Sequence, residues 1–144
     1  MSKNKNNKSY TELDVWRVAV EICDMIYSCT KNFPKEELFC LSNQIRRSAI
    51  SIPSNIAEGC GRKNSKEIIQ FLFIARGSIY ELETQCLIAN NQNFLAETSF
   101  KQISEKITRC KQLINGFINH HATTHKARSA TKHEARSTKH KNGS

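Results

Sequence analysis

Four segments of this chain repeat apolar residues at alternating intervals of three and four, and this pattern constrains the fold more than any other feature. Such spacing places the apolar side chains on one face of an α-helix. No segment shows the apolar–polar alternation of a half-buried strand. The third segment carries the longest run, which reads Ile68, Leu72, Ala75, Ile79, Leu82, Cys86 and Ala89. The sequence therefore predicts an all-α fold.

The ends of these segments predict four helices of similar length. The first is expected to begin at Thr11, as its N-cap, and to end before Pro34. The second starts near residue 38, the third begins at Ser65 as N-cap, and the fourth covers roughly 97–119. About 20 residues per helix gives a length of about 30 Å, and short connections favour antiparallel neighbours. We therefore expect residues 10–119 to form an antiparallel up-down four-helix bundle.

The second helix contains a proline, which predicts a local irregularity. Pro53 removes one backbone hydrogen bond and is expected to kink the helix near Ala49. Asn55 and Glu58 are predicted to satisfy the freed backbone groups, and contact with a ligand is the alternative. Gly59 opens the Gly-Cys-Gly turn that ends the helix. These residues are expected to form a structural motif.

Positive charge is concentrated at the two ends of the chain. Lys and Arg total 22 against 13 Asp and Glu, a net charge of +9. Residues 1–9 contribute +3 and residues 120–144 contribute +5, which leaves residues 10–119 nearly neutral at +1. Residues 120–144 lack large apolar side chains. Both ends are therefore predicted to be disordered basic tails.

Basic residues also cluster in the second helix and in the turn that leads into the third. Bases beside a helix N-terminus suit a phosphate, although solvated charges or ion pairs with Glu58 and Glu67 are the alternative. Binding through such residues is expected to depend steeply on salt and weakly on sequence. The candidate nucleic-acid-binding residues are Arg46, Arg47, Arg62, Lys63, Lys66, Lys126, Arg128, Lys132 and Arg136.

The distribution of histidine argues against catalysis in the bundle. All five histidines lie at or beyond residue 120. The helices therefore lack a histidine that could serve as a general base or a metal ligand. The sequence contains no Glu-x-x-His motif, phosphate-binding loop or dinucleotide fingerprint. We expect a protein that is not an enzyme, with no catalytic residues, no metal and no cofactor.

The six cysteines are predicted to be reduced, and zinc binding, the alternative, lacks both a Cys-x-x-Cys pair and a core histidine. Most of them fall on the apolar stripes, where reduced cysteine serves as a small core residue. The sequence contains no run of about 18 apolar residues, so it predicts no membrane-spanning helix. The N-terminal residues lack the apolar segment of a secretory signal. The sequence therefore predicts a cytoplasmic protein without a membrane partner.

Residues 44–62, and above all the Ile-Pro-x-Asn-Ile-Ala-Glu-Gly core at 52–59, carry a family resemblance. Shorter matches lie at residues 13–16, 33–37, 71–78 and 81–85. Over about residues 10–119 the chain resembles the bacterial 23S rRNA-intervening sequence proteins, which are four-helix bundles. That family is similar to the accessory variability protein of diversity-generating retroelements, a basic pentameric barrel that binds reverse transcriptase and nucleic acid. The resemblance implies a pentamer.

Apolar surface in excess of one bundle core predicts a homo-oligomer. The first helix carries two adjacent apolar stripes, and residues 68–75 are apolar nearly all round. A wide helix face buried within the monomer is the alternative. The leading hypothesis is a pentameric accessory protein that associates with nucleic acid, expected to be RNA, through phosphates. The rival is a scaffold for another protein, such as a reverse transcriptase, without nucleic-acid binding of its own.

Overall fold

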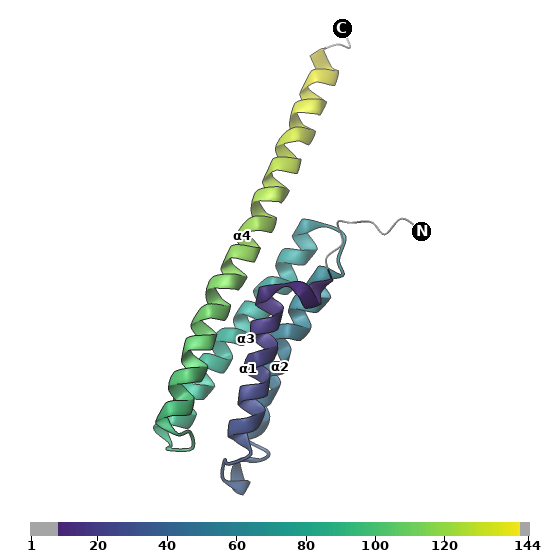
Figure 1. Cartoon of the computed structure of the whole chain (residues 1–144). Coiled ribbons are helices and arrows are strands. Elements are labelled where there is room, and N and C mark those ends of the chain that lie inside the picture. Colours follow the sequence, from purple (N-terminus) through teal and green to yellow (C-terminus); the bar gives the residue numbers. More distant parts are fainter. Residues whose placement is uncertain (1–8, 142–144) are drawn as a thin grey trace, which may run out of the picture.

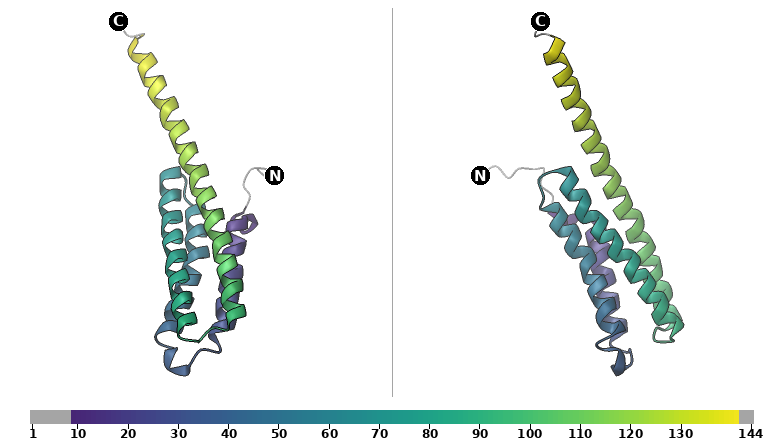
Figure 2. Two further views of the ribbon diagram at one scale, coloured as in Figure 1. Left: turned by 90° about the vertical axis from the view of Figure 1, so that its left-hand side faces the viewer. Right: turned by 180° about the vertical axis from the view of Figure 1, so that it is seen from behind.

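The computed structural model describes residues 9–141, with side chains through Arg136, and all of its regular structure is helical. Consecutive α-helices run in opposite directions and pack in the cyclic order α1–α2–α3–α4 (Figures 1 and 2). The all-α four-helix prediction is confirmed. Within the described range, no helix is long and apolar enough to cross a membrane. The elements are η1 (Tyr10–Glu12), α1 (Asp14–Thr30), η2 (Lys35–Glu37), α2 (Leu41–Cys60), α3 (Ser65–Asn91) and α4 (Glu97–Lys141).

One face of each helix supplies the core. On α1 the buried positions include Val15, Ala19, Ile22 and Ile26, at intervals of four and three. Each fully buried isoleucine contributes roughly 1.5–3 kcal/mol relative to exposure. Cysteine contributes as predicted at two positions, since Cys86 and Cys110 are buried, but Cys40 is exposed. The remaining core residues are Phe33, Ile45, Ala49, Ile52, Ile56, Leu72, Ala75, Ile79, Leu82, Ala89, Leu95, Ile103, Ile107, Ile114 and Ile118.

Helix α2 continues through Pro53 as one element, and its interrupted hydrogen-bond ladder is completed from α1. The Ala49 carbonyl would normally accept the N–H of residue 53, which proline lacks. The Cys23 thiol donates to that carbonyl oxygen over 3.1 Å. Asn55, expected to satisfy the freed group, instead donates to the Ser51 carbonyl oxygen at 2.8 Å. The role predicted for Asn55 therefore belongs to Cys23, whereas the kink stays a prediction.

Small side chains let α2 and α3 approach closely. A Cβ atom placed on Gly59 would lie 3.0 Å from the Cβ of Phe71. About two turns along the same contact, the Ser78 hydroxyl lies 2.8 Å from the Ser51 hydroxyl, within hydrogen-bond distance. Gly59 is therefore required at the interface between two helices, in addition to its predicted place at the end of α2.

Helix α4 extends far past its predicted end and corrects the prediction of a disordered C-terminal tail. It continues as helix from residue 119 to Lys141, so the whole of α4, 45 residues, is about 67 Å long at ~1.5 Å per residue. The second half projects beyond the α2–α3 turn (Figure 1). The composition predicted disorder because residues 120–141 lack large apolar side chains that could be buried in a core. The bundle, however, has already nucleated the helix, and Ala, Lys and Arg propagate it well. Of the predicted N-terminal tail, residues 1–8 lie outside the described range.

Candidate nucleic-acid interface

The face of α4 that packs into the core continues beyond the bundle as a face of basic residues. Inside the bundle, the buried positions recur three and four residues apart and end at Ile118. Beyond it, the same intervals lead to His121 and His125 and then to three permanent charges. We refer to Arg128, Lys132 and Arg136 as the cationic face of α4. Lys126, two residues from Arg128, points to another side of the helix.

His121 lies where the apolar part of this face becomes basic. Its ring is 4.7 Å from that of Phe117 and 5.2 Å from that of His120. Burial lowers the pKa of His121 below its ordinary value, and the neighbouring His120 lowers it further. His121 is therefore mainly neutral at neutral pH, and the permanent charge of this face begins with Arg128.

The α2–α3 turn contributes further bases at the end of the bundle beyond which α4 projects (Figures 1 and 2). Lys63 and Lys66 are exposed there. Arg62 forms the ion pair with Glu58 that was the alternative to phosphate binding, with Nη2 and Oε1 2.7 Å apart, and its guanidinium lies 4.7 Å from the centre of the Phe71 ring. Two basic elements thus share one end of the molecule.

The start of α3 differs in detail from the prediction. Asn64, and not Ser65, is the N-cap, and its side-chain oxygen accepts the backbone N–H of Glu67 at 2.9 Å. Ser65 is buried as the first residue of the helix. The negative Glu67 side chain in the first turn complements the helix dipole. It therefore competes with an anion for this helix end, and Lys63 and Lys66 remain the stronger contribution to phosphate binding.

Arg46 and Arg47 do not join the bases of the turn. They lie 14 and 13 residues before Cys60, the last residue of α2, a separation of about 20 Å along the helix axis, and Arg62 follows beyond that end. Arg46 donates from Nε to the Thr30 hydroxyl at 2.8 Å and stacks over Tyr27 at 4.8 Å, so it joins α2 to α1. The five bases predicted from the sequence to form one patch are therefore divided between two places.

Arg47 lines a polar groove between α2 and α3 with a volume of about 400 Å³. The Ser48 hydroxyl donates to the Glu81 carboxylate across this groove at 3.2 Å. The buried Oε1 atom of Gln85 accepts no hydrogen bond from the described residues. The carboxylate of Glu81 opposes phosphate binding here, which leaves Arg47 poorly placed for the predicted role. The full lining comprises Gln44, Arg47, Ser48, Ser51, Glu81 and Gln85.

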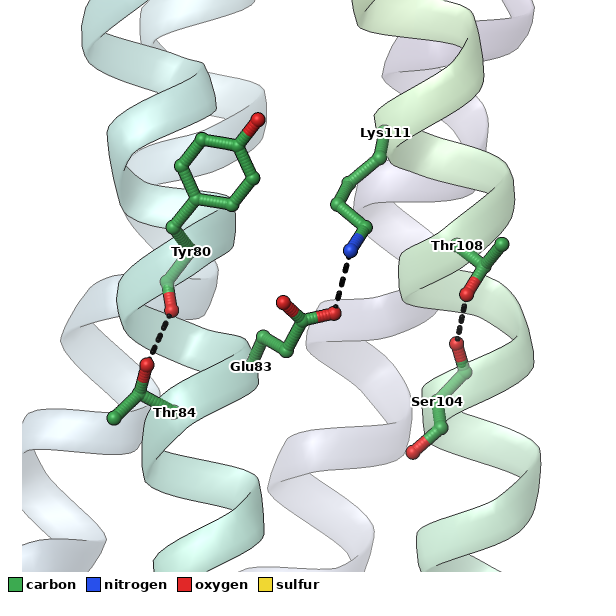
Figure 3. A network of polar contacts seen from close by, with 6 residues as sticks. All are labelled: Tyr80, Glu83, Thr84, Ser104, Thr108 and Lys111. Carbon is green, nitrogen blue, oxygen red and sulfur yellow. Dashed lines mark hydrogen bonds and ion pairs between the residues drawn. The ribbon is translucent and has the colours of Figure 1, made fainter.

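On the outside of the bundle, α3 and α4 are joined by a polar contact (Figure 3). Lys111 of α4 pairs with Glu83 of α3, the nitrogen and oxygen 2.7 Å apart. The nearby hydroxyls of Thr84 and Thr108 donate to carbonyl oxygens of their own helices. Such hydroxyls lack the adjacent base that activates a nucleophile. Among residues 9–136, His, Cys, Asp and Glu side chains do not gather in threes as metal ligands would.

Burial makes the core thiols poor nucleophiles. It raises the pKa of Cys23 and of Cys29 to about 11, and that of Cys86 and of Cys110 to about 12. At neutral pH these groups are protonated, and the thiolate is the reactive form. The described cysteines of the core are therefore structural.

An apolar surface on the outside of α3 accompanies these basic elements. Phe73, Tyr80 and Leu87 recur every seven residues and are 46%, 47% and 50% exposed. Ile74 and Ile88 lie beside them and are exposed as well. We call these five residues the outer apolar face of α3. On this helix the sequence predicted surplus apolar surface at residues 68–75, whereas the exposed apolar side chains continue to Ile88.

Comparison with known proteins places this fold in a family. The model of the 23S rRNA-intervening sequence protein matches residues 11–116. A crystal structure from Bacteroides thetaiotaomicron, of a protein of unknown function in the S23 ribosomal protein family, shares 24% identity and a TM-score of 0.67. The match covers 72% of this chain and 97% of that one, and it supports the fold. No curated protein is similar enough to count as a relative. Because the family model covers most of the helical bundle, the chain belongs to the family of 23S rRNA-intervening sequence proteins.

Proposed function

We propose that this protein is a non-enzymatic nucleic-acid-binding protein that contacts phosphates through the cationic face of α4, assisted by Lys63 and Lys66. The observation that supports this proposal is that the face of α4 buried in the core continues beyond the bundle as a row of basic side chains. RNA is the favoured ligand because the family takes its name from a sequence that intervenes in 23S rRNA.

The geometry of the cationic face suits a polyanion. Arg128, Lys132 and Arg136 follow one another at intervals of four, so they form a row about 12 Å long on one side of the helix. Glu134 is the one acid in residues 120–144. It stands two residues from both Lys132 and Arg136 and therefore on another side. A charged row of this kind displaces counterions from phosphates without reading bases.

A salt series with matched variants tests this proposal. The full chain and the variant Arg128→Gln/Lys132→Gln/Arg136→Gln are titrated with RNA between about 50 and 200 mM salt. Each lost phosphate contact flattens the slope of log K against log salt by about 0.7 for a single strand, so the triple variant should lose about 2. The control Lys31→Gln/Lys35→Gln/Lys101→Gln removes the same charge from exposed sites elsewhere and should keep the slope. Equal slopes for both variants would contradict the proposed interface.

The outer apolar face of α3 supports a homo-oligomer, and the family resemblance favours a pentamer. Exposed aromatic and aliphatic side chains repeated along one helix are typical of a subunit contact. Leu87→Glu, which adds a charge within such a contact, should yield smaller particles in light scattering. The control Lys101→Glu adds an acid at an exposed site of α4 and should not. A wild-type chain that is monomeric at micromolar concentration would refute the oligomer.

A protein-binding scaffold is the second candidate function, and the outer apolar face of α3 favours it as well. In this alternative the face receives another protein, for example a reverse transcriptase, and the basic residues serve solubility. A full chain that binds no RNA at low salt but binds a purified reverse transcriptase would favour this alternative. The absence of catalysis is proposed too, and RNA cleavage by the full chain above the buffer blank would refute it.

A further inference from the structure

A groove that the nucleic-acid proposal does not use lies between η1 and the last turns of α2. It has a volume of about 470 Å³. The element η1 lies toward the end of the bundle that also carries the α2–α3 turn (Figure 1). We call this groove the η1–α2 groove. Its lining residues are Tyr10, Ser54, Ala57, Glu58, Gly61 and Arg62.

One wall of the η1–α2 groove is an aromatic ring held in place by its neighbours. Tyr10 lies in η1 and remains 41% exposed. Its ring and that of Trp16 form an edge-to-face pair, with 5.5 Å between centroids and 66° between planes. Trp16 itself packs against the core. Tyr10 is therefore an accessible aromatic surface with a fixed position.

The other wall combines a positioned cation with unused hydrogen-bonding groups. Arg62 is fixed by its pair with Glu58 Oε1 at 2.7 Å and by the Phe71 ring at 4.7 Å. The second carboxylate oxygen of Glu58 and the hydroxyl of Ser54 make no hydrogen bond with the described residues. Among the described residues Glu58 thus keeps one carboxylate oxygen without a hydrogen-bond donor, on the same side chain that pairs with the Arg62 guanidinium.

We propose that the η1–α2 groove binds one unstacked base of a single-stranded RNA. This inference rests on the proposed function and specifies the class of RNA that the protein binds. Tyr10 stacks on the base and Arg62 pairs with the adjoining phosphate. The free oxygen of Glu58 accepts a hydrogen bond from an exocyclic amino group, as carboxylates do from the N4 amino group of cytosine. Uracil lacks such a group, so the groove discriminates against it.

The choice of a single strand follows from what the groove offers. Bases inside an RNA duplex are stacked on both faces, and their Watson–Crick edges are paired. Only an unstacked base presents a free face to Tyr10 and a free edge to Glu58 at once. The cationic face of α4 binds phosphates of either form, so the η1–α2 groove supplies the preference between them.

Trp16, the one tryptophan of the chain, makes the groove observable. Oligocytidylate and oligouridylate of roughly 12 nucleotides, and an RNA duplex of the same length, are titrated into the full chain at one salt concentration. Oligocytidylate should bind more tightly than oligouridylate and change the Trp16 fluorescence. Tyr10→Leu should weaken oligocytidylate binding by roughly 5- to 100-fold, whereas Tyr10→Phe should keep it because the ring remains. Duplex binding should be the same in both variants.

A second variant and a distant control separate stacking from general damage. Glu58→Gln should reduce the preference for oligocytidylate over oligouridylate, since an amide can also donate to uracil. Tyr27→Leu removes an exposed aromatic from α1 and should leave binding unchanged. If Tyr10→Leu and Glu58→Gln bind like the wild type while the triple variant of α4 does not, the groove proposal is overturned and the proposed function stands. If the wild-type chain binds no RNA, both fall.

Discussion

The Cys23 thiol donates a hydrogen bond to the carbonyl oxygen of Ala49, 3.1 Å away, the carbonyl of α2 that Pro53 leaves without its usual donor. The contact joins α1 to α2 at the position where the ladder of α2 is interrupted. A buried carbonyl without a partner costs about 1–3 kcal/mol. Cys23 thus allows α2 to contain a proline while it remains packed in the bundle.

Replacement of Cys23 by alanine should lower the free energy of unfolding by about 1–2 kcal/mol, because the Ala49 carbonyl loses its donor. Cys23→Ser, which keeps a donor of similar size, should lose less. Urea denaturation of the full chain, followed by circular dichroism, measures both values.

The role of Pro53 is tested in the same experiment. Pro53→Ala restores a backbone N–H to residue 53, so the Ala49 carbonyl regains its helical partner. In that background Cys23→Ala should cost less than in the wild type. An equal cost in both backgrounds would show that Cys23 contributes packing and not the hydrogen bond.

Gly59→Ala should destabilise the bundle by about 1–3 kcal/mol, because the new methyl group meets Phe71 and forces α2 and α3 apart. Gly116→Ala is the matched control, since nothing lies within 4 Å of a Cβ atom at that exposed position of α4. It should stabilise the helix by about 0.5–1 kcal/mol. Thermal denaturation of the two variants should therefore give shifts of opposite sign, and shifts of the same sign would disagree with this packing.

Alkylation should distinguish the cysteines of the folded chain. Cys40 is exposed and should react first with iodoacetamide at pH 7.5. Cys86 and Cys110, whose pKa burial raises to about 12, should react only after unfolding. Mass spectrometry of peptides from native and urea-treated protein identifies the order. Early modification of Cys86 in the native protein would contradict its place in the core.

Acid should loosen the junction between the bundle and the projecting part of α4. The pKa of His121 is lower in the folded chain than the ordinary value of 6.5, so the unfolded chain binds the proton more readily. The contribution of His121 to stability is therefore complete above pH 6.5 and is lost as the pH falls through the lower folded value. Helix content measured by circular dichroism should decline over this range. The helix content of the His121→Gln variant should decline less.

The bundle was predictable from the sequence because apolar spacing reports the buried face of a helix directly. The division of the predicted patch was not, because about 20 Å of rigid helix lies between Arg46 and the end of α2 at Cys60, and Arg62 follows only beyond that end. The pairing of Cys23 with Ala49 depends on the register of two helices, which spacing within each helix does not determine.

The cationic face of α4 and the η1–α2 groove could not be predicted from the sequence either. The intervals of Arg128, Lys132 and Arg136 are visible in the sequence, but composition indicated disorder, and helical spacing has no meaning in a disordered chain. Only the continuity of α4 gives these intervals a common face. The η1–α2 groove required the fold as well, since Tyr10 and Arg62 are separated by the whole of α1 and α2.

The projecting part of α4 has a thermodynamic consequence that follows from its charges. Arg128, Lys132 and Arg136 repel one another at intervals of four, which opposes the helix by about 0.2–0.5 kcal/mol per pair. An anion along that row removes the repulsion, so occupancy and helix formation are linked equilibria. Ligand binding should therefore lengthen the rigid arm of the molecule, and the same linkage should make the charge-neutralised triple variant the more helical protein when no ligand is present.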